Sequence, residues 1–148
     1  MKKIKVIILV LGVIILSACG TEKKSITGEE FKNTLTNLNY TVKNSLDDYD
    51  YAIAAYNASK SGVNVFFLKG KQKYDVEGIF IDEYQNLFNS IEGDYSKKLT
   101  NGKSWTSLKL KTSDKGYYLS WVQDTYIVIN YDLDHENDVN KLIESIGY

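Results

Sequence analysis

The stretch YYLSWVQDTYIVINY, residues 117 to 131, decides the fold. It contains two runs of aromatic and β-branched residues, Tyr117 to Gln123 and Tyr126 to Tyr131, a composition that favours β-strands. Only Asp124 and Thr125 separate the two runs, and a link this short forces the strands to lie antiparallel. The stretch therefore predicts a tight β-hairpin in the C-terminal half of the chain.

Further strands are expected on both sides of this hairpin. Residues Trp105 to Lys111 read as a strand, and the turn residues Ser113 to Gly116 connect it to the hairpin, which makes a three-stranded meander. In the N-terminal half, Tyr51 to Asn57 and Val63 to Lys69 favour strands joined by a loop over Ala58 to Gly62. The alanines of the first segment also suit a short helix, but we favour the strand.

Three helices are expected, each from a start signal followed by apolar residues at helical spacing. Thr27 and Glu30 form a capping box for the first. Asp75 is the expected cap of the second and Asp134 that of the third, which runs to the C-terminus. Residues 94 to 103 read as a polar loop.

These elements predict an α+β fold. We expect an antiparallel sheet of about four to six strands, built from the N-terminal hairpin and the C-terminal meander, with amphipathic helices packed mostly on one face. A helix on a curved sheet, as in cystatin-like or NTF2-like domains, is the alternative.

The N-terminus has the parts of a secretory signal peptide. A lysine-rich start, Met1 to Lys5, precedes the eleven apolar or small residues Val6 to Leu16. Small residues follow, and the apolar run is shorter than the roughly 20 residues that span a bilayer. We therefore exclude this segment from the fold.

Leu16-Ser17-Ala18-Cys19 resembles the lipobox of bacterial lipoproteins. The resemblance implies that a signal peptidase recognises Leu16, Ser17 and Ala18, cuts before Cys19, and leaves Cys19 with an S-diacylglyceryl (lipid) group. The alternative is an ordinary signal peptide with a stray cysteine. Residues 1–18 are thus predicted to be a removed signal peptide, 19–25 a lipidated tether, and 26–148 a single domain.

The amino-acid composition argues against several classes of function. Without Lys2, Lys3 and Lys5, the chain has 15 basic against 19 acidic residues, which argues against binding to nucleic acid. Cys19 is the single cysteine, so its lipidation leaves no thiol for disulfides, catalysis or metal binding. The partner expected from the sequence is the membrane, through the lipid anchor, together with a peptide or protein at the cell surface.

Candidate catalytic and metal-binding residues are few. His135 is the only histidine, and it lies in what reads as the acidic first turn of a helix. Asp47, Asp48 and Asp50 form an acidic cluster in an expected loop, where adjacent carboxylates usually face water. The alternating acids after Asp132 lack the glycine and the final glutamate of a calcium loop. We predict no catalytic residues, no metal site and no cofactor.

Aromatic residues suggest a binding surface instead. The chain has twelve Tyr, five Phe and two Trp, and rigid amphipathic rings make good contact surfaces. On the meander, Tyr117 and Trp121 are expected on one face and Tyr118 on the other. If one face is open to solvent, these residues are a candidate binding surface; otherwise they are core residues of the strands.

The mature chain also resembles a family of small, uncharacterised lipoproteins of Firmicutes. The resemblance rests on Glu30-Phe31, Leu35, Leu38 to Val42, Ser120 to Thr125, Ile143, and Ile146 to Tyr148. Such proteins usually carry glycine where this chain has Asn39.

We therefore expect a lipid-anchored, extracytoplasmic, non-enzymatic binding or accessory protein on the outer face of the cytoplasmic membrane of a Gram-positive bacterium. One alternative is an immunity or surface-exclusion lipoprotein that sequesters a peptide near the membrane. The other is a cell-envelope hydrolase.

Overall fold

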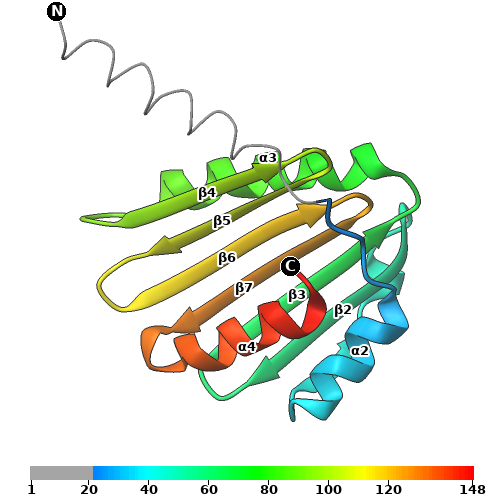
Figure 1. Cartoon of the computed structure of the whole chain (residues 1–148), viewed down its shortest axis with the longest axis horizontal. Coiled ribbons are helices and arrows are strands. Elements are labelled where there is room, and N and C mark those ends of the chain that lie inside the picture. The colour runs from blue at the N-terminus through cyan, green and yellow to red at the C-terminus, as the bar shows by residue number, and fades with distance from the viewer. Residues whose placement is uncertain (1–21) are drawn as a thin grey trace, which may run out of the picture.

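Seven strands form one antiparallel sheet in the order β1-β2-β3-β7-β6-β5-β4 (Figure 1). The computed structural model describes residues 22 to 148, so the predicted signal peptide and Cys19 lie outside the described residues. The strands are β1 (Thr41–Asn44), β2 (Ala52–Lys60), β3 (Val63–Gly70), β4 (Ser96–Gly102), β5 (Trp105–Lys111), β6 (Lys115–Val122) and β7 (Thr125–Asp132). The helices are α2 (Gly28–Asn37), α3 (Lys73–Ser90) and α4 (Glu136–Ile146), with 3-10 turns η1 (Leu46–Asp48) and η2 (Leu133–His135).

The predicted α+β class, the hairpin and the meander are confirmed. Strands β5, β6 and β7 pair in sequence order, and Val122 lies opposite Thr125 across the tight link. The alanine-rich segment is a strand, β2, and it runs three residues further than predicted, so the β2–β3 turn contains only Ser61 and Gly62. The sheet has seven strands, above the four to six expected.

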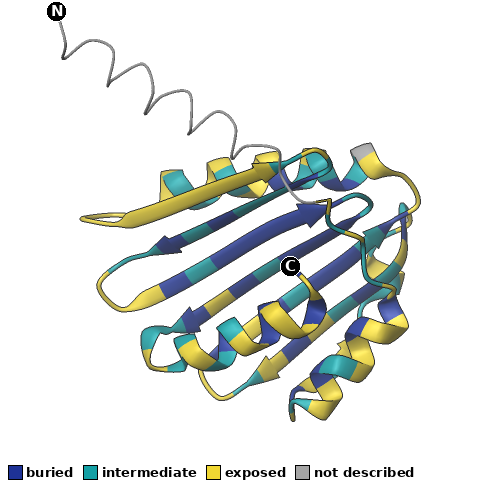
Figure 2. Cartoon of the chain, in the orientation of Figure 1, coloured by how far each residue is buried: buried dark blue, intermediate teal, exposed yellow. Residues whose placement is uncertain are grey.

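The extra strands lie at the two edges of the sheet. The expected loop over residues 94 to 103 is wrong, because β4 pairs with β5 along its whole length. All its residues but Gly102 are exposed, so the strand has no apolar face that the sequence pattern could reveal (Figure 2). At the other edge, β1 is a four-residue strand that pairs with β2.

The pairing of β3 with β7 joins the N-terminal hairpin to the C-terminal meander. Its register runs from Val63 opposite Tyr131 to Lys69 opposite Thr125. The side chains of Val65 and Phe67 enter one core cluster, whereas Leu68 enters a second on the opposite face. These central strands are therefore buried from both sides.

Helices cover both faces of the sheet. Helices α2 and α4 pack together on one face, as expected, and α3 packs on the other (Figure 1). Phe31 of α2 stacks on Phe67 of β3, with ring centroids 4.2 Å apart. On the far side, Val76 and Phe80 of α3 are buried against the meander. No helix within residues 22 to 148 is long and apolar enough to cross a membrane.

Of the three predicted helix caps, one is confirmed and two are wrong. The capping box is present, because Glu30 N–H donates to Thr27 Oγ1 and Thr27 N–H donates to Glu30 Oε2. The predicted cap at Asp75 is wrong, since α3 already begins at Lys73. The cap at Asp134 is also wrong, because η2 precedes α4 and places His135 at its N-cap.

Candidate functional site

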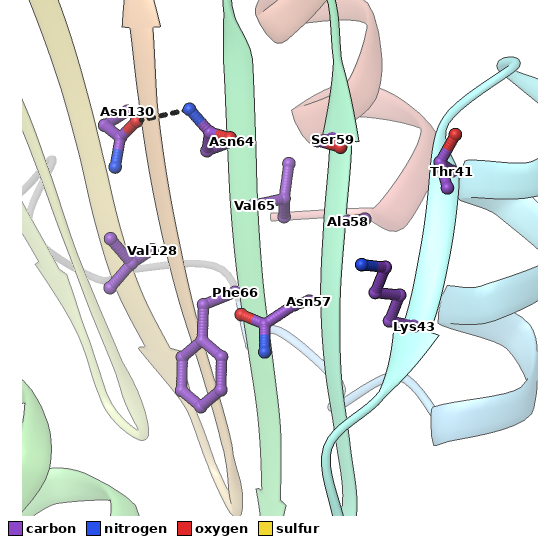
Figure 3. A pocket seen from close by; sticks show the side chains of 10 residues that line it. All are labelled: Thr41, Lys43, Asn57, Ala58, Ser59, Asn64, Val65, Phe66, Val128 and Asn130. Carbon is purple, nitrogen blue, oxygen red and sulfur yellow. Dashed lines mark hydrogen bonds between the residues drawn. The ribbon is translucent and has the colours of Figure 1, made fainter.

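A polar hollow lies on the α3 face of the sheet, beside the part that α3 covers (Figure 3). Its volume is about 310 Å³. Strands β1, β2, β3 and β7 supply the residues that line it, which are Thr41, Lys43, Asn57, Ala58, Ser59, Asn64, Val65, Phe66, Val128 and Asn130. We call this set of residues the polar hollow.

Amides and hydroxyl groups from neighbouring strands form the rim of the polar hollow. The register places Asn64 opposite Ser59 on one side and opposite Asn130 on the other, so the three side chains share one face. Asn64 Nδ2 donates to Asn130 Oδ1 at 3.2 Å. Lys43 is the only charged residue among those that line the hollow. The rim thus offers donors and acceptors with one positive charge.

The floor of the polar hollow is apolar. Phe66 and Val128 lie directly opposite each other on β3 and β7, and both are half-buried. Tyr49 packs against Phe66 from the side, with ring centroids 5.5 Å apart. A half-buried aromatic ring with amides beside it can bind a ligand that has both a polar edge and an apolar face.

The polar hollow is open because α3 does not extend across the whole sheet. Helix α3 contacts β3, β6 and β7. Strands β1 and β2 on this face carry exposed polar side chains, such as Lys43, Asn57 and Ser59, in place of core residues. Here the sheet has the alternation of a half-solvated antiparallel sheet, apolar toward α2 and polar toward water.

A second hollow, of about 340 Å³, lies between the edge of α3 and the same sheet face. Phe66 and Val128 line both hollows. Tyr126, which is 1% exposed, also lines the second one. Its buried hydroxyl has no hydrogen-bond partner among the described residues. Burial, and then the nearby Glu83 carboxylate, raise the pKa of Tyr126, so the group stays a neutral donor.

The aromatic residues predicted as a binding surface are mostly in the core. Tyr118 is 2% exposed and lies in the cluster beneath α4, and Trp121 is 7% exposed and lies in the cluster beneath α3. The predicted alternation of the two faces is confirmed, but neither face of β6 is open. Only Tyr117 is partly exposed, and it lines a hollow beside α3 with Leu87.

The acidic cluster and the histidine lie far apart in the fold. Asp47 and Asp48 are exposed in η1, and the carbonyl of Asp50 accepts a hydrogen bond from Lys71 Nζ. His135 packs at the β2–β3 turn, where a Cβ added to Gly62 would lie 2.3 Å from its ring. Within the described part of the chain, no group of three or more His, Cys, Asp or Glu residues is placed to hold a metal ion.

Sequence reasoning missed the residues of the polar hollow. Asparagine is depleted in strands, yet Asn57, Asn64 and Asn130 each lie within a strand and all are exposed. Asparagine within segments that otherwise favour strands was thus a sequence feature that could have pointed to the polar hollow. It could not be used without the register that brings the three strands together.

We compared the chain with protein families, curated proteins and solved structures. No family model matches it, and no curated protein matches it. A crystal structure described as a GTP binding regulator from Thermotoga maritima is similar to it, at 11% sequence identity. The match covers 79% of this chain and 87% of that one, with a TM-score of 0.49. A likeness of this size is no basis for assigning an activity.

The buried hydroxyl of Tyr126, which has no hydrogen-bond partner among the described residues, leads to a stability prediction. Tyr126→Phe removes a buried polar group that has no partner, so we expect the free energy of unfolding to rise by about 1 kcal/mol. Tyr148→Phe is the matched control. Its hydroxyl contacts Thr125 Oγ1 and accepts a hydrogen bond from Ile26 N–H, so its removal should lower the free energy by about 1 kcal/mol.

Urea unfolding followed by tryptophan fluorescence measures both variants. A loss of stability in Tyr126→Phe equal to that in Tyr148→Phe would contradict the assignment of the Tyr126 hydroxyl as unpartnered.

Proposed function

We propose that this protein is a lipid-anchored, extracytoplasmic, non-enzymatic binding or accessory protein on the outer face of the cytoplasmic membrane of a Gram-positive bacterium. The observation that carries the proposal is the sequence Leu16-Ser17-Ala18-Cys19 at the end of a basic and then apolar N-terminal run. In this proposal Cys19 becomes the first residue of the mature chain and carries the diacylglyceryl group.

The lipid accounts for stable attachment on physical grounds. One acyl chain of myristoyl length gives marginal, reversible binding, whereas two hydrophobic signals give stable anchoring. A diacylglyceryl group supplies two chains through one residue. The domain therefore needs no membrane-binding surface of its own in order to stay at the bilayer.

The polar hollow is our candidate for the ligand site. It combines the amides of Asn64 and Asn130, the Lys43 ammonium and the ring of Phe66. This set can orient a polar ligand and cover an apolar part of it. A peptide in extended conformation has both properties, which supports the alternative that the protein is an immunity or surface-exclusion lipoprotein sequestering a peptide.

A cell-envelope hydrolase is the less favoured alternative. Such an enzyme needs an acid and a base that converge on one bond. Asp50 contacts Lys71 beside the β6–β7 end of the sheet, whereas His135 packs on the Gly62 turn at the opposite end. The titratable residues singled out in the sequence therefore do not meet.

The lipid anchor is tested by Cys19→Ala. Without the sulfur the acyl group cannot be added, so the variant should stay as the uncleaved precursor or leave the membrane. Ser17→Ala is the matched control, because it keeps small residues before the cysteine and should be processed normally. Membrane fractionation and intact-mass spectrometry measure both. Normal cleavage and membrane retention of Cys19→Ala would defeat the proposal.

The ligand site is tested by filling the polar hollow. Asn64→Trp places a ring in it, whereas Asn101→Trp places the same ring on exposed β4 as a control. NMR titration of the domain with short peptides, and separately with soluble cell-wall fragments, should shift amides lining the hollow. We expect Asn64→Trp to weaken that binding about tenfold or more, which corresponds to 1.4 kcal/mol. Hydrolysis of either probe, or equal loss in Asn101→Trp, would contradict a binding role for the hollow.

A further inference from the structure

The segment from Glu22 to Ile26, which follows the predicted lipidation site, lies against the domain. It passes the end of β6 before it enters α2 (Figure 1). Lys23, Ser25 and Ile26 are each only partly exposed. The sequence alone suggested a free polar tether here, and its contacts differ from that expectation. We call residues 22–26 the strap.

Gln123 holds the strap through both ends of its side-chain amide. Its Nε2 donates to the carbonyl oxygen of Lys23 at 3.1 Å, and its Oε1 accepts from Ser25 Oγ at 3.4 Å. Gln123 itself is fixed in the β6–β7 turn with φ 55°, where its backbone N–H donates to the carbonyl oxygen of Ser104 at 2.8 Å. The strap is thus attached to the β6–β7 turn.

A charged pair on the sheet adds a second attachment. Lys69 Nζ forms an ion pair with Asp124 at 2.8 Å, and the Lys69 side chain is 15% exposed. The same ammonium group donates to Ser25 Oγ at 3.3 Å. Ser25 therefore lies between the amide of Gln123 and the ammonium of Lys69.

Lys23 packs on an aromatic ring at the start of β5. Its Nζ lies 4.2 Å from the centroid of Trp105, within the range of a cation–π interaction. Burial, and then the positive charge of Lys109, lower the pKa of Lys23. The strap thus partly buries an ammonium group, which a freely moving tether would leave in water.

We propose that residues 22–26 form a fixed strap that seats the β6–β7 end of the sheet on the bilayer surface. This inference rests on the proposed acylation of Cys19. Lys23 is the fourth residue after Cys19, and four extended residue steps limit the distance between them to about 14 Å. The opposite end of the sheet lies a further strand length away, about 25 Å for eight residues.

The chemistry of the seated end suits a lipid headgroup surface. Exposed lysines lie there on the strap, after β3, at the start of α3 and in the β4–β5 turn: Lys24, Lys71, Lys73 and Lys103. The exposed acids Glu22 and Asp50 lie at the same end, so this surface offers charges of both signs to headgroups that also carry both. The polar hollow lies toward the other end, because Ser59 and Asn64 flank the Ser61-Gly62 turn. The strap therefore presents the hollow to the space outside the membrane.

The docking of the strap is tested by trypsin cleavage after Lys23 and Lys24 in the full chain held in detergent. Gln123→Ala removes both hydrogen bonds of the amide, so the strap should open more often and be cut about tenfold faster. Gln72→Ala, at an exposed glutamine without a capping hydrogen bond at the same end of the sheet, should leave the rate unchanged. Equal rates in all three proteins would overturn the strap.

The seating on the membrane is tested with the acylated protein in vesicles of phosphatidylglycerol and phosphatidylethanolamine. Acylation consumes the Cys19 thiol, so a cysteine introduced by Lys103→Cys or Ser113→Cys is the only one that takes a fluorophore. Nitroxide on the lipid headgroups should quench the label at residue 103 several-fold more than the label at residue 113. Gln123→Ala should bring the two values together.

The outcomes separate this inference from the proposed function. Equal quenching at residues 103 and 113 in a protein whose acyl mass is confirmed would overturn the seating and leave the lipid anchor intact. A membrane preparation in which Cys19 carries no acyl mass would defeat the lipid anchor and the seating together. In that case the trypsin comparison still decides whether the strap is docked.

Discussion

The pairing of β3 with β7 is the interaction on which the rest of the structure depends. It joins residues about sixty positions apart in the sequence, so its formation must overcome a large loop-closure entropy. Burial of apolar side chains on both faces of β3 and β7 offsets this entropy cost. Val65, Phe67, Ile127 and Ile129 enter the core beneath α2 and α4, whereas Leu68 and Tyr126 enter the core beneath α3. Without this pairing the hairpin and the meander would be separate, weak sheets.

The candidate site follows from the same pairing. Once β3 and β7 are adjacent, Asn64 and Asn130 meet on one face, and Phe66 and Val128 form the floor between them. Helix α3 packs on this face over β3, β7 and β6, whereas the outer part of β1 and β2 stays polar and open. The strap uses the other end of β7, where Gln123 and Asp124 form the turn between β6 and β7. One strand thus positions both the polar hollow and the attachment of the N-terminal segment.

The sequence was sufficient for elements whose residues show a local pattern. Alternation and turn residues located the meander, and the capping box located α2. Asn39, where the similar lipoproteins usually carry glycine, has a left-handed φ of 63°. Strand β4 has no apolar face, so periodicity missed it. The binding surface was placed on Tyr118 and Trp121 because the pattern of β6 does not reveal that helices cover both its faces.

Features formed by residues far apart in the sequence could not be predicted, because they depend on how the strands pair. The polar hollow needs residues from four strands, and the strap needs Gln123, Lys69 and Trp105 to lie near residues about a hundred, forty-five and eighty positions away. Nothing in the segment from Glu22 to Ser25 indicates by itself that it is docked. Its polar composition is equally that of a free linker.

The pairing of β3 with β7 is tested most directly by cross-strand NOE contacts in an NMR study of the domain. The register requires contacts between Val65 and Ile129 and between Phe67 and Ile127. Contacts between Ser120 and Ile127, across β6 and β7, serve as the reference. All three sets of NOE contacts are expected in the same sample. Loss of the β3–β7 contacts in a protein that retains those of the meander would contradict the single sheet.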